Sequence, residues 1–212
     1  LGELDAPEFA TGGRDEIAVR VPALLASSVV VLLLYGFVRR ERGSATGLCA
    51  AALYAVLTWA FNVWQIPGAG NVGIRPAIVI PMFFGIAFGP IVGFITGFVG
   101  NILADMLSGY GFWIWWDLGN GIIGLIPGIF SALVVKYNEV KSILWAELSV
   151  ILGSALGMGV ASISEIWVSG ADMNTVLLAN FLPSFITNIV WGLVLLPLLM
   201  IAYAAILKRS GR

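Results

Sequence analysis

Polar side chains interrupt the apolar segments of this chain at regular helical spacing. Asn101, Asp105 and Ser108 lie four and three residues apart, so they share one face of a helix. Asp117 and Asn120 stand at the start of the next apolar segment. Carboxylates and amides are costly in hydrocarbon, so such residues face a protein interior or a water-filled cavity. Directional hydrogen bonds and charge pairing from these groups would fix the orientation of a small molecule in a pocket.

The residue types needed for most catalysis and metal binding are scarce. The chain has no histidine, which removes histidine-based acid–base catalysis, Ser-His-Asp chemistry and histidine metal ligation. Its single cysteine, Cys49, rules out an internal disulfide. A net charge of −1 predicts no nucleic-acid partner. We therefore expect a binding protein rather than an enzyme, with no catalytic residue, no metal and no cofactor.

Composition identifies the surroundings of these residues. The chain is 59% apolar and 11% charged, whereas soluble domains are about half apolar and about a quarter charged. Several apolar runs approach the roughly 20 residues that cross a bilayer as a helix. The composition predicts an all-α polytopic membrane protein that contacts the lipid bilayer along most of its length.

The apolar segments divide the chain into three parts. Residues 1–16 are polar and acidic, and we expect them to be disordered or a remnant of processing. Residues 17–43 are expected to form an extra N-terminal transmembrane helix followed by a basic cytoplasmic loop. Residues 44–212 are expected to form a six-helix substrate-binding domain. Its expected spans are 44–64, 75–89, 91–107, 117–135, 142–167 and 176–207, with an interfacial turn in the last span before Pro183.

Basic residues set the expected orientation. When the spans alternate, three groups of basic residues fall on the same side: Arg39 with Arg40 and Arg42, Lys136 with Lys141, and Lys208 with Arg209. The positive-inside rule makes that side cytoplasmic. We therefore expect a multi-pass protein with a cytoplasmic C-terminus. Arg75 is the exception, because it falls outside.

Polar residues gather in the outer parts of the spans, while the inner halves are mostly apolar and small. The outer set is Asn62, Arg75, Asn101, Asp105, Asp117, Asn120, Glu165, Asn180, Ser184 and Asn188. A channel would need polar groups along its full depth, and a symmetric carrier would need a midplane site between two repeats. The asymmetry instead predicts a cup that binds a solute from outside and relies on another component to move it.

Each candidate site residue has a structural alternative. Arg75 would pair with an acidic or phosphate-like group of the solute, or anchor to a lipid headgroup. Asp105 would accept hydrogen bonds from a ring amine, or pair with Arg75 inside the protein. Asn101, Asn120 and Asn188 would bond a buried heterocycle, or bond neighbouring helices.

Two further features have alternatives of the same kind. The aromatic loop 108–116 is either a lid, with Trp113 and Trp116 stacked on a planar solute, or an interfacial belt. Gly47, Ala51 and Ala55 form a face of small residues on the first core helix. That face is suited to close helix packing, either within the chain or against a separate subunit.

Four sequence strings resemble the substrate-binding S components of energy-coupling factor (ECF) transporters. They are RPAIVIP from Arg75, GPIVGF from Gly89, GNILAD over Gly100–Asp105 and LGNGIIGLIPG from Leu118. The resemblance covers roughly residues 44–207 and includes the count of six spans. The segment at 17–38 departs from the six-helix pattern as an additional helix.

The resemblance implies a role in uptake across the plasma membrane of a prokaryote. S components bind a vitamin or related micronutrient at the outer face and associate with a transmembrane T component and two cytoplasmic ATPases. The small-residue face at Gly47, Ala51 and Ala55 would contact the T component, and loops 65–74, 108–116 and 168–175 would cover the ligand. The paired aspartates of riboflavin-binding members are not seen, whereas a pyrimidine, thiamine-like or corrinoid ligand stays open.

Three other classes remain as alternatives. A self-sufficient secondary transporter of a small heterocyclic solute would move its substrate without ATPase partners. A membrane enzyme would have to work without histidine, and a structural subunit would assemble normally but bind no solute.

Overall fold

The structure, a computed structural model, describes residues 44–62 and 73–210 of the chain. The expected remnant at 1–16, the extra helix at 17–43 and most of the loop at 65–74 lie outside the described residues. The helices in chain order are α2 (Ser44–Phe61), η1 (Pro76–Ile78), α3 (Val79–Phe88), α4 (Pro90–Ser108), α5 (Ile114–Phe130), η2 (Ser131–Leu133), α6 (Val140–Val168), η3 (Thr175–Phe181) and α7 (Leu182–Arg209).

Four helical segments are long and apolar enough to cross a bilayer. They are Pro90–Ser108, Ile114–Leu133, Val140–Val168 and Thr175–Arg209, and the helices at Ala45–Phe61 and Pro76–Phe88 are apolar but shorter. Along α7 an apolar residue recurs every fourth position, and each is more than half exposed: Ile186, Val190, Val194 and Leu198. Such a stripe is suited to lipid. The prediction of an all-α polytopic membrane protein is confirmed.

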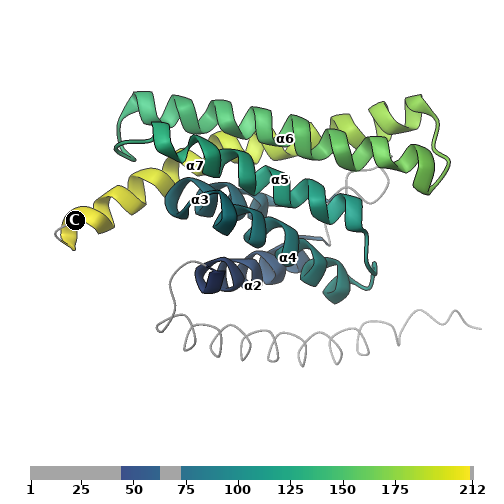
Figure 1. Cartoon of the computed structure of the whole chain (residues 1–212), viewed down its shortest axis with the longest axis horizontal. Helices are drawn as coiled ribbons and strands as arrows, with labels where there is room; N and C mark the ends of the chain where they lie inside the picture. The colour runs from purple at the N-terminus through teal and green to yellow at the C-terminus, as the bar shows by residue number, and fades with distance from the viewer. Residues whose placement is uncertain (1–43, 63–72, 211–212) are drawn as a thin grey trace, which may run out of the picture.

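The helices form a bundle with α4 and α5 at its centre. Helix α4 packs against α2 on one side and α5 on the other, and α5 packs in turn against α6. The shorter α3 contacts both α4 and α5, and α7 contacts α6 and α3. Figure 1 shows α2 and α6 at opposite edges of the bundle, and the C-terminal part of α7 extends beyond the other helices.

Glycines allow the central helices to touch backbone to backbone. A Cβ atom added to Gly93 on α4 would collide with the Gly124 carbonyl on α5, and one added to Gly124 would collide with the Gly93 carbonyl. Gly119 on α5 and Gly157 on α6 face each other in the same way. Small residues at such crossings let backbones approach and pack without a hydrophobic driving force. The result is a tight seam through the middle of the bundle.

Two local structures differ from the sequence prediction. Helix α5 begins at Ile114, so the expected loop 108–116 is shorter, and it turns on Gly109 and Gly111 with positive φ of 75° and 84°. Glycine reaches this region without the clash that a Cβ atom causes. The expected turn before Pro183 is wrong, because η3 is a π-helix that runs directly into α7. Pro183 lies in the first turn of α7, immediately after η3.

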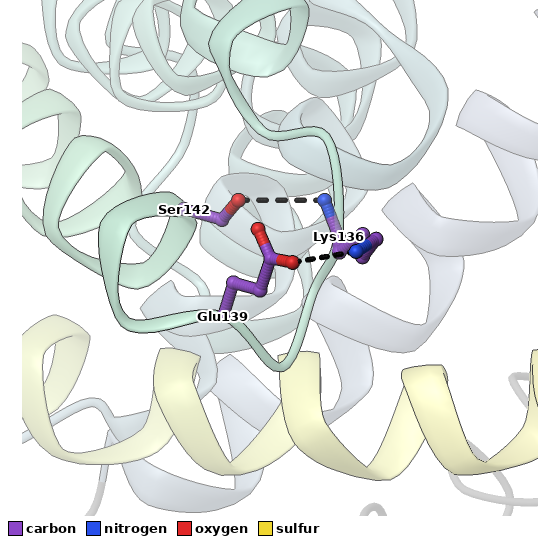
Figure 2. Close-up of polar contacts among 3 residues, drawn as sticks. All are labelled: Lys136, Glu139 and Ser142. Atoms are coloured by element: carbon purple, nitrogen blue, oxygen red, sulfur yellow. Dashed lines mark hydrogen bonds and ion pairs between the residues drawn. The ribbon is translucent and has the colours of Figure 1, made fainter.

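Lys136, in the connection from η2 to α6, and Lys141, in the first turn of α6, lie at one end of the bundle, called here the basic end. Figure 2 shows Lys136 Nζ donating to Glu139 Oε1 at 2.7 Å, while the Lys136 backbone N–H donates to Ser142 Oγ at 3.4 Å. The hydrogen bond to Glu139 raises the pKa of Lys136. Because both charges are exposed, the pair contributes little to stability. Lys136 therefore stays charged, as an orientation signal requires.

Candidate solute-binding site

A cavity of about 350 Å³ lies at the end of the bundle opposite the basic end. The C-terminal parts of α2, α4 and α6 meet the beginnings of α5, η3 and α7 around it. Its volume is within the usual range for small-molecule sites, roughly 300–1,000 Å³. Its lining residues are Asn62, Arg75, Asn101, Asp105, Tyr110, Trp113, Trp116, Asn120, Glu165, Ser169, Ala171, Thr175, Asn180 and Ser184.

One wall of the cavity is a hydrogen-bonded network centred on Asn101. Its amide nitrogen donates to Asp105 Oδ2 at 2.9 Å and to Asp117 Oδ1 at 2.8 Å. Its amide oxygen accepts a longer bond, 3.4 Å, from Arg75 Nη1. Asp117 is fully buried in the first turn of α5, where the helix dipole favours negative charge. Asn101 thus donates to two carboxylates that come from different helices.

A second buried bond ties α2 to α5 beneath this wall. Tyr54 OH donates to Asn120 Oδ1 at 2.9 Å, and Asn120 Nδ2 donates to the Trp116 carbonyl at 2.9 Å. Tyr54 is fully buried, and its ring occupies the space that a side chain at Gly100 would fill. Sequence reasoning missed Tyr54, because nothing in an apolar segment marks a partner 66 residues away. Asn120 therefore makes the interhelical bond that was the alternative to solute binding, while its side chain also lines the cavity.

The opposite wall is organised by Glu165 on α6. Its Oε1 accepts from Trp116 Nε1 at 2.7 Å, and its Oε2 accepts from Ser169 Oγ at 2.7 Å. Glu165 is only 9% exposed. The indole N–H of Trp113 donates to the Tyr110 carbonyl at 2.8 Å. The indole N–H of each tryptophan is thus already bonded within the protein. Both rings can offer the cavity only carbon surface and π-electrons.

Helices η3 and α7 each contribute a polar side chain to the cavity. Ser184 lines the cavity and is 3% exposed, yet its hydroxyl has no hydrogen-bond partner among the described residues. Asn180 lines the cavity one turn earlier, in the π-helix. A buried polar group without a partner is destabilising. Ser184 is therefore a group that a bound solute or a water molecule would satisfy.

Side-chain hydrogen bonds connect the segments at the rim of the cavity. Asn62 at the end of α2 donates to Ser108 Oγ at the end of α4 at 2.8 Å. Asp172 accepts from the backbone N–H of Thr175, the first residue of η3, at 2.9 Å. That hydrogen bond lowers the pKa of Asp172, which lies in the loop outside the spans. Asp172 therefore stays ionised at the cavity end of the bundle.

The structure brings ten of the twelve predicted site residues to this one cavity. Asp117 lies behind Asn101 instead, and Asn188 is buried further along α7 without lining the cavity. Sequence reasoning did not single out four lining residues, namely Tyr110, Ser169, Ala171 and Thr175, although loops 108–116 and 168–175 were expected to cover a ligand. The role of all these residues in substrate binding stays a prediction.

The structure bears on two of the alternatives that the sequence left open. Arg75 donates to Asn101 Oδ1, and the Arg75–Asp105 pairing that was the alternative for Asp105 is not among the ion pairs of the described residues. The small-residue face of α2 is also turned inward. Ala51 and Ala55 are 0% and 2% exposed, and Gly47 faces Ile95 of α4. This face therefore packs within the chain, which was one of its two alternatives, and its contact with a partner stays a prediction.

Comparison with known proteins agrees with this architecture. The family model of the ECF-type riboflavin transporter, S component, matches residues 42–205, which include every helix that lines the cavity. The chain belongs to this family. The resemblance drawn from the sequence strings is therefore confirmed, and the chain is a member of a family of membrane-embedded transport subunits rather than of enzymes.

Curated relatives of this S component carry the name UPF0397 protein. One from Streptococcus sanguinis is 32% identical over 170 residues, covering 79% of this chain and 92% of that protein. One from Streptococcus pneumoniae is 32% identical over 165 residues, covering 76% and 88%. One from Aliivibrio salmonicida is 33% identical over 117 residues, covering 53% of this chain and only 63% of that protein. No solved structure gives a significant match.

Proposed function

We propose that this S component captures a micronutrient with a planar heterocycle from the outer face of a prokaryotic plasma membrane. A T component and two cytoplasmic ATPases would then drive its delivery into the cell. The observation that carries the proposal is the polar cavity at one end of an otherwise apolar bundle. The family supports the role of substrate-binding subunit, and the two indoles in the cavity favour a planar ring.

The packing in the inner half of the bundle favours a protein that binds the solute but does not transport it alone. Beneath the cavity the core is filled by fully buried apolar side chains, including Met82, Ile123, Leu196 and Met200. The glycine seam closes the remaining space between α4 and α5. A secondary transporter would need a site that opens to either side, and this packing favours the family role over that alternative.

The orientation follows from the charges. Lys136, Lys141, Lys208 and Arg209 gather at the basic end, and the positive-inside rule makes that end cytoplasmic. The cavity then opens to the outside. The matched family model is named for riboflavin, a neutral molecule that would bind here only if the solute is not a cation.

Uptake by purified components tests the proposal. We expect liposomes that hold the S component alone to bind solutes extracted from a vitamin-rich medium but not to accumulate them. Accumulation should appear only when a T component, the two ATPases and ATP are added. Mass spectrometry of the liposome contents measures both outcomes. Concentrative uptake by the S component alone would instead establish a secondary transporter.

A further inference from the structure

The cavity also indicates the charge of the solute, and this inference rests on the proposed function. We infer that the solute carries a net positive charge, and that its cationic group lies at the corner formed by Glu165, Trp113 and Trp116. The carboxylate would supply the charge, and the two rings would supply the flanking surfaces. No sequence comparison assigns this corner a role.

The outer end of the bundle has an excess of acidic residues. Within the described residues, 44–62 and 73–210, the acidic residues at that end are Asp105, Asp117, Glu165 and Asp172, whereas Arg75 is the only basic one. A cleft with one sign of charge and low-dielectric walls concentrates ions of the opposite sign. The cavity therefore attracts cations.

The single positive charge is already balanced on the other wall. Arg75 contacts the amide oxygen of Asn101, and both hydrogens of that amide go to the carboxylates of Asp105 and Asp117. Arg75 is thus linked through one side chain to two negative groups. An anionic group of the solute placed beside Arg75 would also meet these carboxylates. The expectation that Arg75 binds an acidic group of the solute is therefore disfavoured by its surroundings.

Glu165, in contrast, has no cation beside it. It is 9% exposed, and its two oxygens accept bonds from an indole and a hydroxyl, both neutral. No lysine or arginine among the described residues lies within 4 Å of it. A buried carboxylate without a counter-charge is unfavourable, so a cationic group of a solute is the partner that this side chain lacks.

The aromatic surroundings of Glu165 favour the same partner. Trp113 and Trp116 line the cavity, and their N–H groups are used by Tyr110 and Glu165. An adjoining cavity of about 230 Å³ shares Trp113, Trp116 and Glu165, so these residues form the wall between the two spaces. Indole faces attract cations through the ring quadrupole. A carboxylate in the same cavity wall as two such rings matches an aromatic nitrogen cation better than a neutral ring.

A matched pair of small probes tests the inference. 1-Methylnicotinamide is a cation, whereas nicotinamide is its neutral counterpart without the methyl group. We expect calorimetric titration of the purified full chain to give a Kd at least tenfold lower for the cation. The Glu165→Gln variant should abolish that difference, because glutamine can accept from Trp116 and donate to the Ser169 hydroxyl while the charge is gone.

Asp172→Asn is the control, because Asp172 is an acidic residue at the outer end that does not line the cavity. It should change either Kd less than threefold. Equal Kd values for the two probes, no binding of the cation, or a preference that survives Glu165→Gln would each overturn the inference. The proposed function would stand in all three cases if the protein still released a bound solute on denaturation. If no solute were released, the proposed function would fail as well.

Discussion

Replacing Asn101 with leucine is expected to lower the free energy of unfolding by about 3–5 kcal/mol, because two buried carboxylates lose a hydrogen-bond donor. The amide nitrogen of Asn101 donates to Asp105 and Asp117 at 2.9 and 2.8 Å. Leucine has a similar size but no donor, so both carboxylates would lose this bond inside the bundle. The other oxygen of Asp117 already has no partner among the described residues. Thermal unfolding in detergent should show a loss of roughly 10 °C.

Asn188→Leu is the matched control on α7. Asn188 is buried, 6% exposed, and its side chain makes no hydrogen bond within the described part of the chain. The same chemical change there removes an amide without stranding a partner, so the unfolding temperature should stay within about 2 °C or rise. Equal losses in Asn101→Leu and Asn188→Leu would show that the network around Asn101 contributes nothing specific.

The second large effect is expected for Ala51→Leu. Ala51 is 0% exposed, and its backbone lies against Gly100 of α4. The added atoms have no space, and overpacking of this kind costs about 1–3 kcal/mol. The unfolding temperature should therefore fall in the isolated protein, before any partner is present. Thermal unfolding of the purified S component measures the effect.

Leu53→Ala provides the comparison on the same helix, because Leu53 is 42% exposed. That variant should unfold at nearly the wild-type temperature. If Ala51→Leu instead folded normally and lost only the ability to assemble with a T component, the small-residue face would be a partner surface after all. The assignment to internal packing would then be wrong.

The spans and the polar end were predictable because both depend on local patterns. Runs of apolar residues mark the helices, and Asn101 with Asp105 at four-residue spacing marks a polar face. Alternation of the spans then places the polar ends together. None of these steps requires knowledge of which helices are neighbours.

What escaped prediction depends on neighbours far apart in the sequence. The bond from Tyr54 to Asn120 joins residues 66 apart, and that from Trp116 to Glu165 joins residues 49 apart. A face of small residues on α2 predicts a close helix contact but not which helix makes it. The π-helix at η3 has no local sequence signal, and its continuity with α7 overrode the turn expected before Pro183.

Native mass spectrometry of the wild-type protein and its Ser184→Trp variant tests most directly whether the cavity holds the solute. Ser184 lines the cavity without belonging to the Asn101 network, so an indole there would occupy the space of a solute. We predict one small molecule bound per wild-type chain, and none bound to a Ser184→Trp variant that unfolds at the wild-type temperature. An unchanged bound solute in that variant, or no solute in either protein, would contradict the assignment of the outer cavity as the binding site.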